Sequence, residues 1–131
     1  MKTIAIIIIP IFVQTINIFG QQNPLGSDSL INHLKGVWYV VNQSTQDSLV
    51  FKRKSNLPYN WGSRIEFNEN GEFVDSYSAR CGNDSSHHND KGTWYIEKNG
   101  IIITSIPLVL YGKKNKILSI TDDTLVLKKI Q

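Results

Sequence analysis

The chain has 131 residues, a length that accommodates one hydrophobic core and excludes two ordinary domains. Its net charge is only +3, and the basic clusters, Lys52-Arg53-Lys54 and Lys113-Lys114-Asn115-Lys116, lack interleaved aromatic residues, which argues against a nucleic-acid binder. Cys81 is the only cysteine, so an internal disulfide is excluded and the core must stabilise the fold.

The N-terminal segment differs in composition from the rest of the chain. Lys2 carries one positive charge, and residues 4–13 form an apolar run that is short for a membrane span and leads into polar residues without a stop-transfer pattern. We expect a signal peptide over 1–20 and a mature domain over 21–131 that is secreted or periplasmic, with no stable membrane anchor after cleavage. An uncleaved anchor is the alternative.

After this leader we predict one short helix and then only strands. Residues 27–36 (SDSLINHLKG) begin with capping serines and end at Gly36, which favours one or two helical turns. Beyond it, β-branched and aromatic residues recur in short runs between turn residues. The expected strands cover residues 37–41, 49–51, 64–67, 72–77, 93–97, 101–104, 117–121 and 124–127.

Three tight turns join these strands into hairpins. Asn70-Gly71 and Asn99-Gly100 are strong hairpin signals, and Asp122-Asp123 is better explained as a turn than as a pair of catalytic carboxylates. Successive hairpins favour an all-β, up-and-down antiparallel meander, and closure into a barrel removes exposed edges. An open sandwich is the structural alternative.

Several phrases of the sequence resemble lipocalin-like proteins. Residues 34–38 (LKGVW) look like the L-x-G-x-W opening of that family, and residues 65–73 (IEFNENGEF), 92–96 (GTWYI) and 117–127 are similar to small secreted bacterial members in order and spacing. The resemblance implies an eight-stranded barrel behind a short helix, with Trp38 packed across one end. It also implies an internal cavity for one small apolar ligand.

Two further expectations follow from this resemblance. Typical lipocalins place an Arg from the end of the barrel against the motif Trp, whereas this chain offers Lys128 or Lys129. In an up-and-down barrel, alternate connections share an end. The tight turns would then lie at one end (43–47, 68–71, 98–100 and 122–123), and the longer loops at the end where the first strand begins (54–62, 79–91 and 106–114).

Aromatic residues are the candidate ligand contacts. Strand alternation predicts four that face the interior, as cavity walls or as ordinary core: Phe67, Phe73, Tyr77 and Trp94. Tyr59 and Trp61 lie in a polar loop, where they either cap the core, as we expect, or form an exposed recognition patch.

The segment 81–90 contains a thiol, two imidazoles and two carboxylates. Cys81, His87 and His88 would suit zinc or copper, but adjacent histidines on a strand point to opposite faces, so we predict a polar surface connection and no metal. A Cys–His nucleophile has no identifiable oxyanion donor or orienting partner, so we predict no enzymatic activity and no cofactor. A disulfide from Cys81 to another chain stays open.

Two functions are compatible with these patterns. The first is non-covalent binding or carriage of a small hydrophobic ligand in an extracytoplasmic barrel. The alternative is a protein-interaction or inhibitor module with a filled barrel that acts through its long loops, for which the sequence identifies no partner. An empty interior would favour the first function, and an exposed aromatic patch would favour the second.

Overall fold

The computed structural model describes residues 27–41, 45, 47–81, 84–109 and 111–130. The expected signal peptide over 1–20 therefore lies outside the described residues. Within the described part, no helix is long and apolar enough to cross a membrane.

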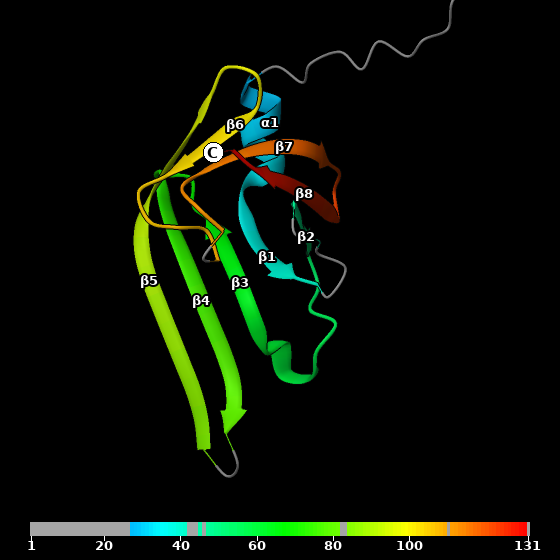
Figure 1. Cartoon of the computed structure of the whole chain (residues 1–131), viewed down its shortest axis with the longest axis vertical. Helices are drawn as coiled ribbons and strands as arrows, with labels where there is room; N and C mark the ends of the chain where they lie inside the picture. The colour runs from blue at the N-terminus through cyan, green and yellow to red at the C-terminus, as the bar shows by residue number, and fades with distance from the viewer. Residues whose placement is uncertain (1–26, 42–44, 46, 82–83, 110, 131) are drawn as a thin grey trace, which may run out of the picture.

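Eight antiparallel strands close into a barrel behind one short helix (Figure 1). In chain order the elements are α1 (Ser27–Leu34), β1 (Gly36–Val40), β2 (Ser48–Lys52), the 3₁₀ turn η1 (Pro58–Asn60), β3 (Gly62–Phe67), β4 (Glu72–Cys81), β5 (Asp84–Glu97), β6 (Ile101–Thr104), β7 (Lys114–Ile120) and β8 (Thr124–Lys129). The predicted fold class is confirmed: all-β, a closed eight-stranded antiparallel barrel and a helix before the first strand.

One connection departs from the expected meander. Strand β1 pairs with both β2 and β3, and β2 pairs with β8 on its other side. Because β2 and β3 are each antiparallel to β1, they run in the same direction. The connection 53–61 therefore runs from one end of the barrel to the other instead of forming a hairpin.

This strand order reverses the expected placement of the loops. The end where β1 begins, here called the helix end, carries the turns 68–71, 98–100 and 121–123. The opposite end, here called the hairpin end, carries the tip of the β4–β5 hairpin and the connection 105–113. The prediction that the longer loops share the end where the first strand begins is wrong, because β3 runs against β1 rather than along it.

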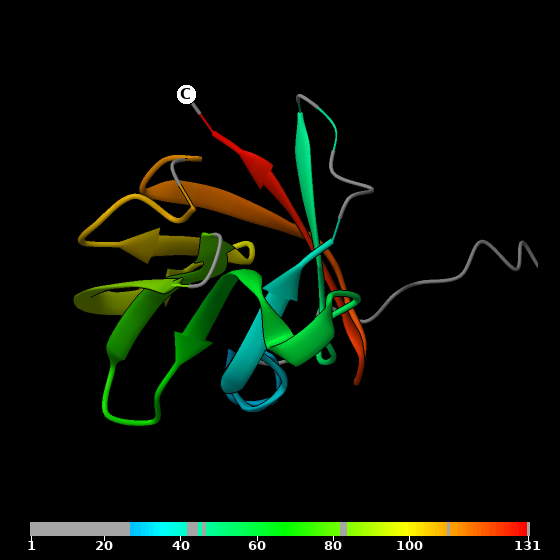
Figure 2. The ribbon, with the colours of Figure 1, turned by 90° about the horizontal axis from the view of Figure 1, so that it is seen from below.

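Strands β4 and β5 form a two-stranded ribbon that projects beyond the barrel (Figure 1). The prediction that residues 79–91 form a loop is wrong, since most of them belong to these two strands. Residues 86–90 are all exposed, so both faces of the ribbon meet water and no alternation of apolar residues marks it in the sequence. Figure 2 shows the molecule from the side on which this ribbon projects.

The core fills the barrel with side chains from all eight strands and from outside the sheet, with β7 contributing Ile117 and Ile120 at its margin. Its fully buried strand members are Trp38, Phe51, Ile65, Phe67, Phe73, Ile102, Leu125 and Leu127. Leu34 from α1 and Leu108 from the connection 105–113 join this cluster and are also fully buried. The barrel is thus closed from one end by a helix residue and from the other by a loop residue.

Candidate functional site

The helix end is closed by Arg53 packed on Trp38. The Arg53 guanidinium carbon lies 3.6 Å from the centre of the Trp38 ring, and the Trp38 Nε1–H donates to the Leu34 carbonyl at 2.7 Å. Arg53 also donates to the carbonyls of His33 and Val37. The guanidinium therefore joins the helix, the first strand and the motif Trp in one contact set.

The expectation that Lys128 or Lys129 takes this place is wrong, because both are exposed at the far end of β8. Arg53, the residue directly after β2, occupies this place instead. Its backbone N–H donates to the Asp123 carbonyl at 3.0 Å. Burial lowers the pKa of Arg53, and the Asp122 carboxylate partly opposes this. Arg53 is the only arginine of the basic cluster 52–54. Because a planar guanidinium can stack on a tryptophan ring, this arginine was the signal in the sequence for the residue that packs on Trp38.

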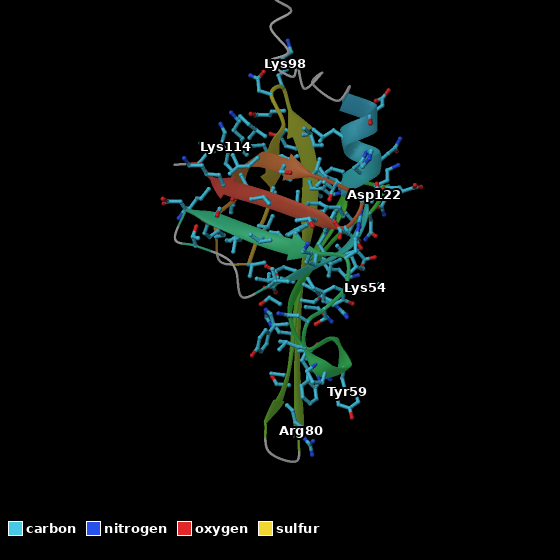
Figure 3. All side chains as sticks on the ribbon, turned by 90° about the vertical axis from the view of Figure 1, so that its right-hand side faces the viewer. Lys54, Tyr59, Arg80, Lys98, Lys114 and Asp122 are labelled. Atoms are coloured by element: carbon cyan, nitrogen blue, oxygen red, sulfur yellow. The ribbon has the colours of Figure 1, made fainter. Side chains whose placement is uncertain are left out.

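The helix also contacts each of the three turns at its end of the barrel. His33 Nε2 lies 3.7 Å from Asp122 Oδ1, and Asp122 is seen beside α1 in Figure 3. Lys35, just after the helix, pairs with Glu69 at 3.2 Å. Leu30 approaches Gly100 so closely that a Cβ there would lie 3.9 Å from its side chain. These contacts close the helix end on all sides of Trp38.

Three of the predicted interior aromatic residues meet near the helix end. The ring centre of Phe67 lies 5.3 Å from that of Phe73 and 5.0 Å from that of Trp94, and Trp94 Nε1–H donates to the Asn68 carbonyl. All three are buried. In this part of the barrel the rings pack on one another.

Tyr77 lies apart from these three rings. It occupies the same face of β4 as Phe73, closer to the hairpin end, and its partner across the ribbon is His88. Its side chain is 46% exposed. Tyr77 therefore stands where the inner face of the barrel passes into the projecting ribbon.

Asp75 lies between Phe73 and Tyr77 on this face and forms a hydrogen bond to the connection 105–113. Its Oδ2 accepts the Val109 N–H at 2.6 Å. Burial raises the pKa of Asp75 against the lowering effect of that hydrogen bond, and Asp90, its cross-strand partner, raises it further. His88, which contacts Asp90 at 2.8 Å, has a smaller lowering effect on the Asp75 pKa.

Asn115 is a buried polar residue that sequence reasoning assigned only to a basic surface cluster. It faces Ile102 across β6–β7 and is fully buried. Its Nδ2 donates to the Gly112 carbonyl at 3.0 Å, which fixes the orientation of the amide, while its Oδ1 has no hydrogen-bond partner in the part of the chain that the structure describes. A buried unpartnered acceptor is costly and is rare in native proteins.

The ring of Tyr59 is exposed beside the partly buried ring of Trp61. Their ring centres lie 5.1 Å apart, Tyr59 is 84% exposed, and its backbone adopts a left-handed conformation (φ 56°). The expectation that Tyr59 caps the core is therefore wrong. Figure 3 shows Tyr59 on the same side as Arg80 of the β4–β5 ribbon and far from Lys98 at the helix end.

The histidines of the segment 81–90 point to opposite faces of β5. His87 Nδ1 lies 3.1 Å from Ser78 Oγ, whereas His88 pairs with Asp90. The side chain of Cys81 lies outside the described residues. Within the described part of the chain, no three His, Cys, Asp or Glu side chains come together as a metal-binding group.

A surface depression lies at the helix end, lined by Lys52, Arg53, Lys54 and Asp123. Lys52 Nζ donates to Thr124 Oγ1 at 2.6 Å, and hydrogen bonds from Thr124 and Thr121 lower the pKa of Asp123. The polar groups here serve the β7–β8 turn and the Arg53 contact, so this depression belongs to the closure of the barrel.

Comparison with known proteins agrees with this architecture. The family model of the lipocalin-like domain matches residues 34–127, from the last residue of α1 into β8. No curated protein and no solved structure gives a significant match. The matched span includes Trp38, Arg53, strands β1 to β7 and the first four residues of β8, and the chain belongs to the lipocalin-like domain family.

Proposed function

We propose that this protein binds a small hydrophobic molecule non-covalently inside its barrel, outside the cytoplasm, and performs no chemistry on it. The observation that carries the proposal is the unequal closure of the two barrel ends. At the helix end, Arg53, Trp38 and α1 form an interlocked set of contacts. At the hairpin end, the loop residue Leu108 fills the interior.

This difference between the two ends favours entry of the ligand into the barrel from the hairpin end. A side chain supplied by a loop can be withdrawn without breaking the sheet, whereas opening the helix end would separate α1 from three turns. In the proposed complex, the rings of Phe67, Phe73 and Trp94 are the floor of the site and Tyr77 is at its mouth. Family membership supports binding in such a barrel rather than catalysis.

A second candidate function is protein recognition through the loop 55–61, which the filled interior and the exposed Tyr59 favour by the criteria drawn from the sequence; carriage requires the interior to be opened by withdrawal of a side chain. Tyr59 is 84% exposed beside Trp61, and Leu57 of the same loop is also exposed. Tyr59 also keeps a left-handed backbone conformation, which is unfavourable for a residue with a bulky side chain. Exposed aromatic residues held in a fixed geometry are typical of interaction hot spots.

Native mass spectrometry of the mature protein, purified from its host's extracytoplasmic fraction, tests both candidates. Carriage predicts a stoichiometric adduct of small-molecule mass that is lost when the protein unfolds. Its mass without adduct also reports whether the chain begins near residue 21, as export requires. An adduct-free mass together with a co-purifying protein would overturn carriage. Loss of that protein in Tyr59→Ser but not in Tyr95→Ser, which changes another exposed tyrosine on β5, would support recognition by the loop.

A further inference from the structure

The segment that supplies Leu108 is fitted tightly onto the barrel. Residues 105–109 are here called the plug. The Ser105 N–H donates to the Thr93 carbonyl at 2.9 Å, and the Thr93 N–H donates to Ser105 Oγ at 2.8 Å. A Cβ built on Gly92 would lie 2.4 Å from Ser105 Oγ and 3.0 Å from Ile106 Cγ1. The absence of a side chain at Gly92 therefore makes room for the plug.

The inner end of the plug is held in a strained conformation. Val109 has φ 49°, a left-handed conformation that β-branched residues rarely adopt. Its N–H is held by the half-buried carboxylate of Asp75 at 2.6 Å. Withdrawal of the plug would relax Val109 and return Asp75 to water, and both changes offset part of the cost of exposing Leu108.

Asn115 lies directly beside the inner end of the plug. The Gly112 carbonyl accepts both the Leu108 N–H and the Asn115 Nδ2–H, each at 3.0 Å. The side-chain amide of Asn115 and the backbone of Leu108 therefore converge on one atom. Asn115 Oδ1 is fully buried and has no hydrogen-bond partner among the described residues, whereas the buried Thr104 hydroxyl donates to the Ile106 carbonyl.

We propose that the ligand replaces the Leu108 side chain when the plug withdraws, and that a hydroxyl or N–H group on the ligand donates to Asn115 Oδ1. The inference rests on the proposed carriage function and defines the ligand class as an apolar molecule with one hydrogen-bond donor. A buried acceptor without a partner discriminates strongly in favour of a molecule that can donate to it.

Two probes that differ in one donor test this inference: para-hexylphenol and its methyl ether. Affinities are measured by tryptophan fluorescence titration of the mature protein and its variants. Leu108→Ala removes most of the plug side chain and is expected to bind both probes at least about tenfold more tightly than the parent protein. In this variant the phenol should bind about tenfold more tightly than the ether, the effect of one satisfied hydrogen bond.

Two further variants make the test specific. Leu108→Ala combined with Asn115→Leu should bind both probes equally, because the acceptor is gone. Leu125→Ala is a matched control, since it makes the same truncation at an equally buried residue near the helix end and should show no preference for the phenol. If the double variant fails to fold, Gly92→Ala is used in its place. Its new Cβ would displace the plug while Leu108 and Asn115 are unchanged, so this variant should bind the phenol more tightly than the ether.

A preference for the phenol that persists without Asn115, or that is equal in Leu125→Ala, overturns the inference. So does failure of both probes to bind any variant. The carriage function is judged separately by the adduct in the native mass spectrum, so a bound natural ligand without a phenol preference would overturn the role of Asn115 alone.

Discussion

The guanidinium of Arg53 lies 3.6 Å from the ring centre of Trp38, because the antiparallel register of β1 and β2, which pairs Tyr39 with Lys52, places the residue after β2 opposite Trp38. The same guanidinium donates to the His33 and Val37 carbonyls. One side chain thus fixes the helix and the first strand to the closed end of the barrel.

Replacement of Arg53 by lysine should destabilise the fold. Lysine keeps the charge but cannot stack a planar group on Trp38 while donating to two carbonyls, so we expect a loss of about 1–2 kcal/mol in the free energy of unfolding. Urea unfolding measures it. Lys54→Ala, an exposed neighbour in the same basic cluster, should change stability by less than about 0.5 kcal/mol. Equal effects of the two changes would contradict a structural role for the Arg53 contact.

The packing of the interior aromatic residues predicts that replacing each of them by alanine lowers the free energy of unfolding by a different amount. Phe67→Ala removes a ring that contacts both Phe73 and Trp94 and should cost about 3–5 kcal/mol of stability. Tyr77→Ala, on the same face but half-exposed, should cost about 1 kcal/mol or less. Chemical denaturation of both variants gives the comparison. If Phe67→Ala were as mild as Tyr77→Ala, the ring of Phe67 would border a void rather than the core.

Asp75 should make stability depend on pH. Burial raises its pKa in the folded protein above 3.8, so the folded state binds more protons than the unfolded state between 3.8 and the raised value. The contribution of Asp75 to the free energy of unfolding therefore falls as pH rises through this window. Asp75→Asn lacks this loss, and its stability relative to the parent protein should increase from about pH 4 to pH 7.

Urea unfolding of both proteins at several pH values measures this difference. Asp90 and His88, the charged groups that face Asp75 across the ribbon, titrate in both proteins, and comparison of the two largely cancels their effects. If Asp75→Asn instead lost relative stability as pH rose, the Val109 N–H bond would outweigh burial at this carboxylate.

Gly92→Ala should destabilise the protein through contact with the plug. The new Cβ would meet Ser105 Oγ at 2.4 Å, while Gly92 itself has an ordinary backbone conformation that alanine can adopt. We expect a loss of about 1–3 kcal/mol, typical of overpacking. A double-mutant cycle with Ser105→Gly should recover part of it, because the closest contact is then absent. Additive effects of the two changes would show that Gly92 and Ser105 do not interact.

Local chemistry in the sequence determined much of this fold. The Asn-Gly and Asp-Asp turns and the alternating runs predicted eight strands and one helix in the observed order, because each depends on residues adjacent in the chain, although β4 and β5 extend well beyond the predicted 72–77 and 93–97. The L-x-G-x-W phrase likewise predicted that Trp38 packs across one end of the barrel.

Tertiary structure alone decided the strand order and the candidate site. Insertion of β1 between β2 and β3 is a choice between long-range pairings that leaves no local pattern, and it determined which loops share an end. The register of β1 against β2 brought Arg53 to Trp38. Residues 79–81 and 84–91 of the polar ribbon became strand because they gained cross-strand partners despite weak local preference. The unpartnered oxygen of Asn115 and the strain at Val109 exist only once the barrel has closed around them.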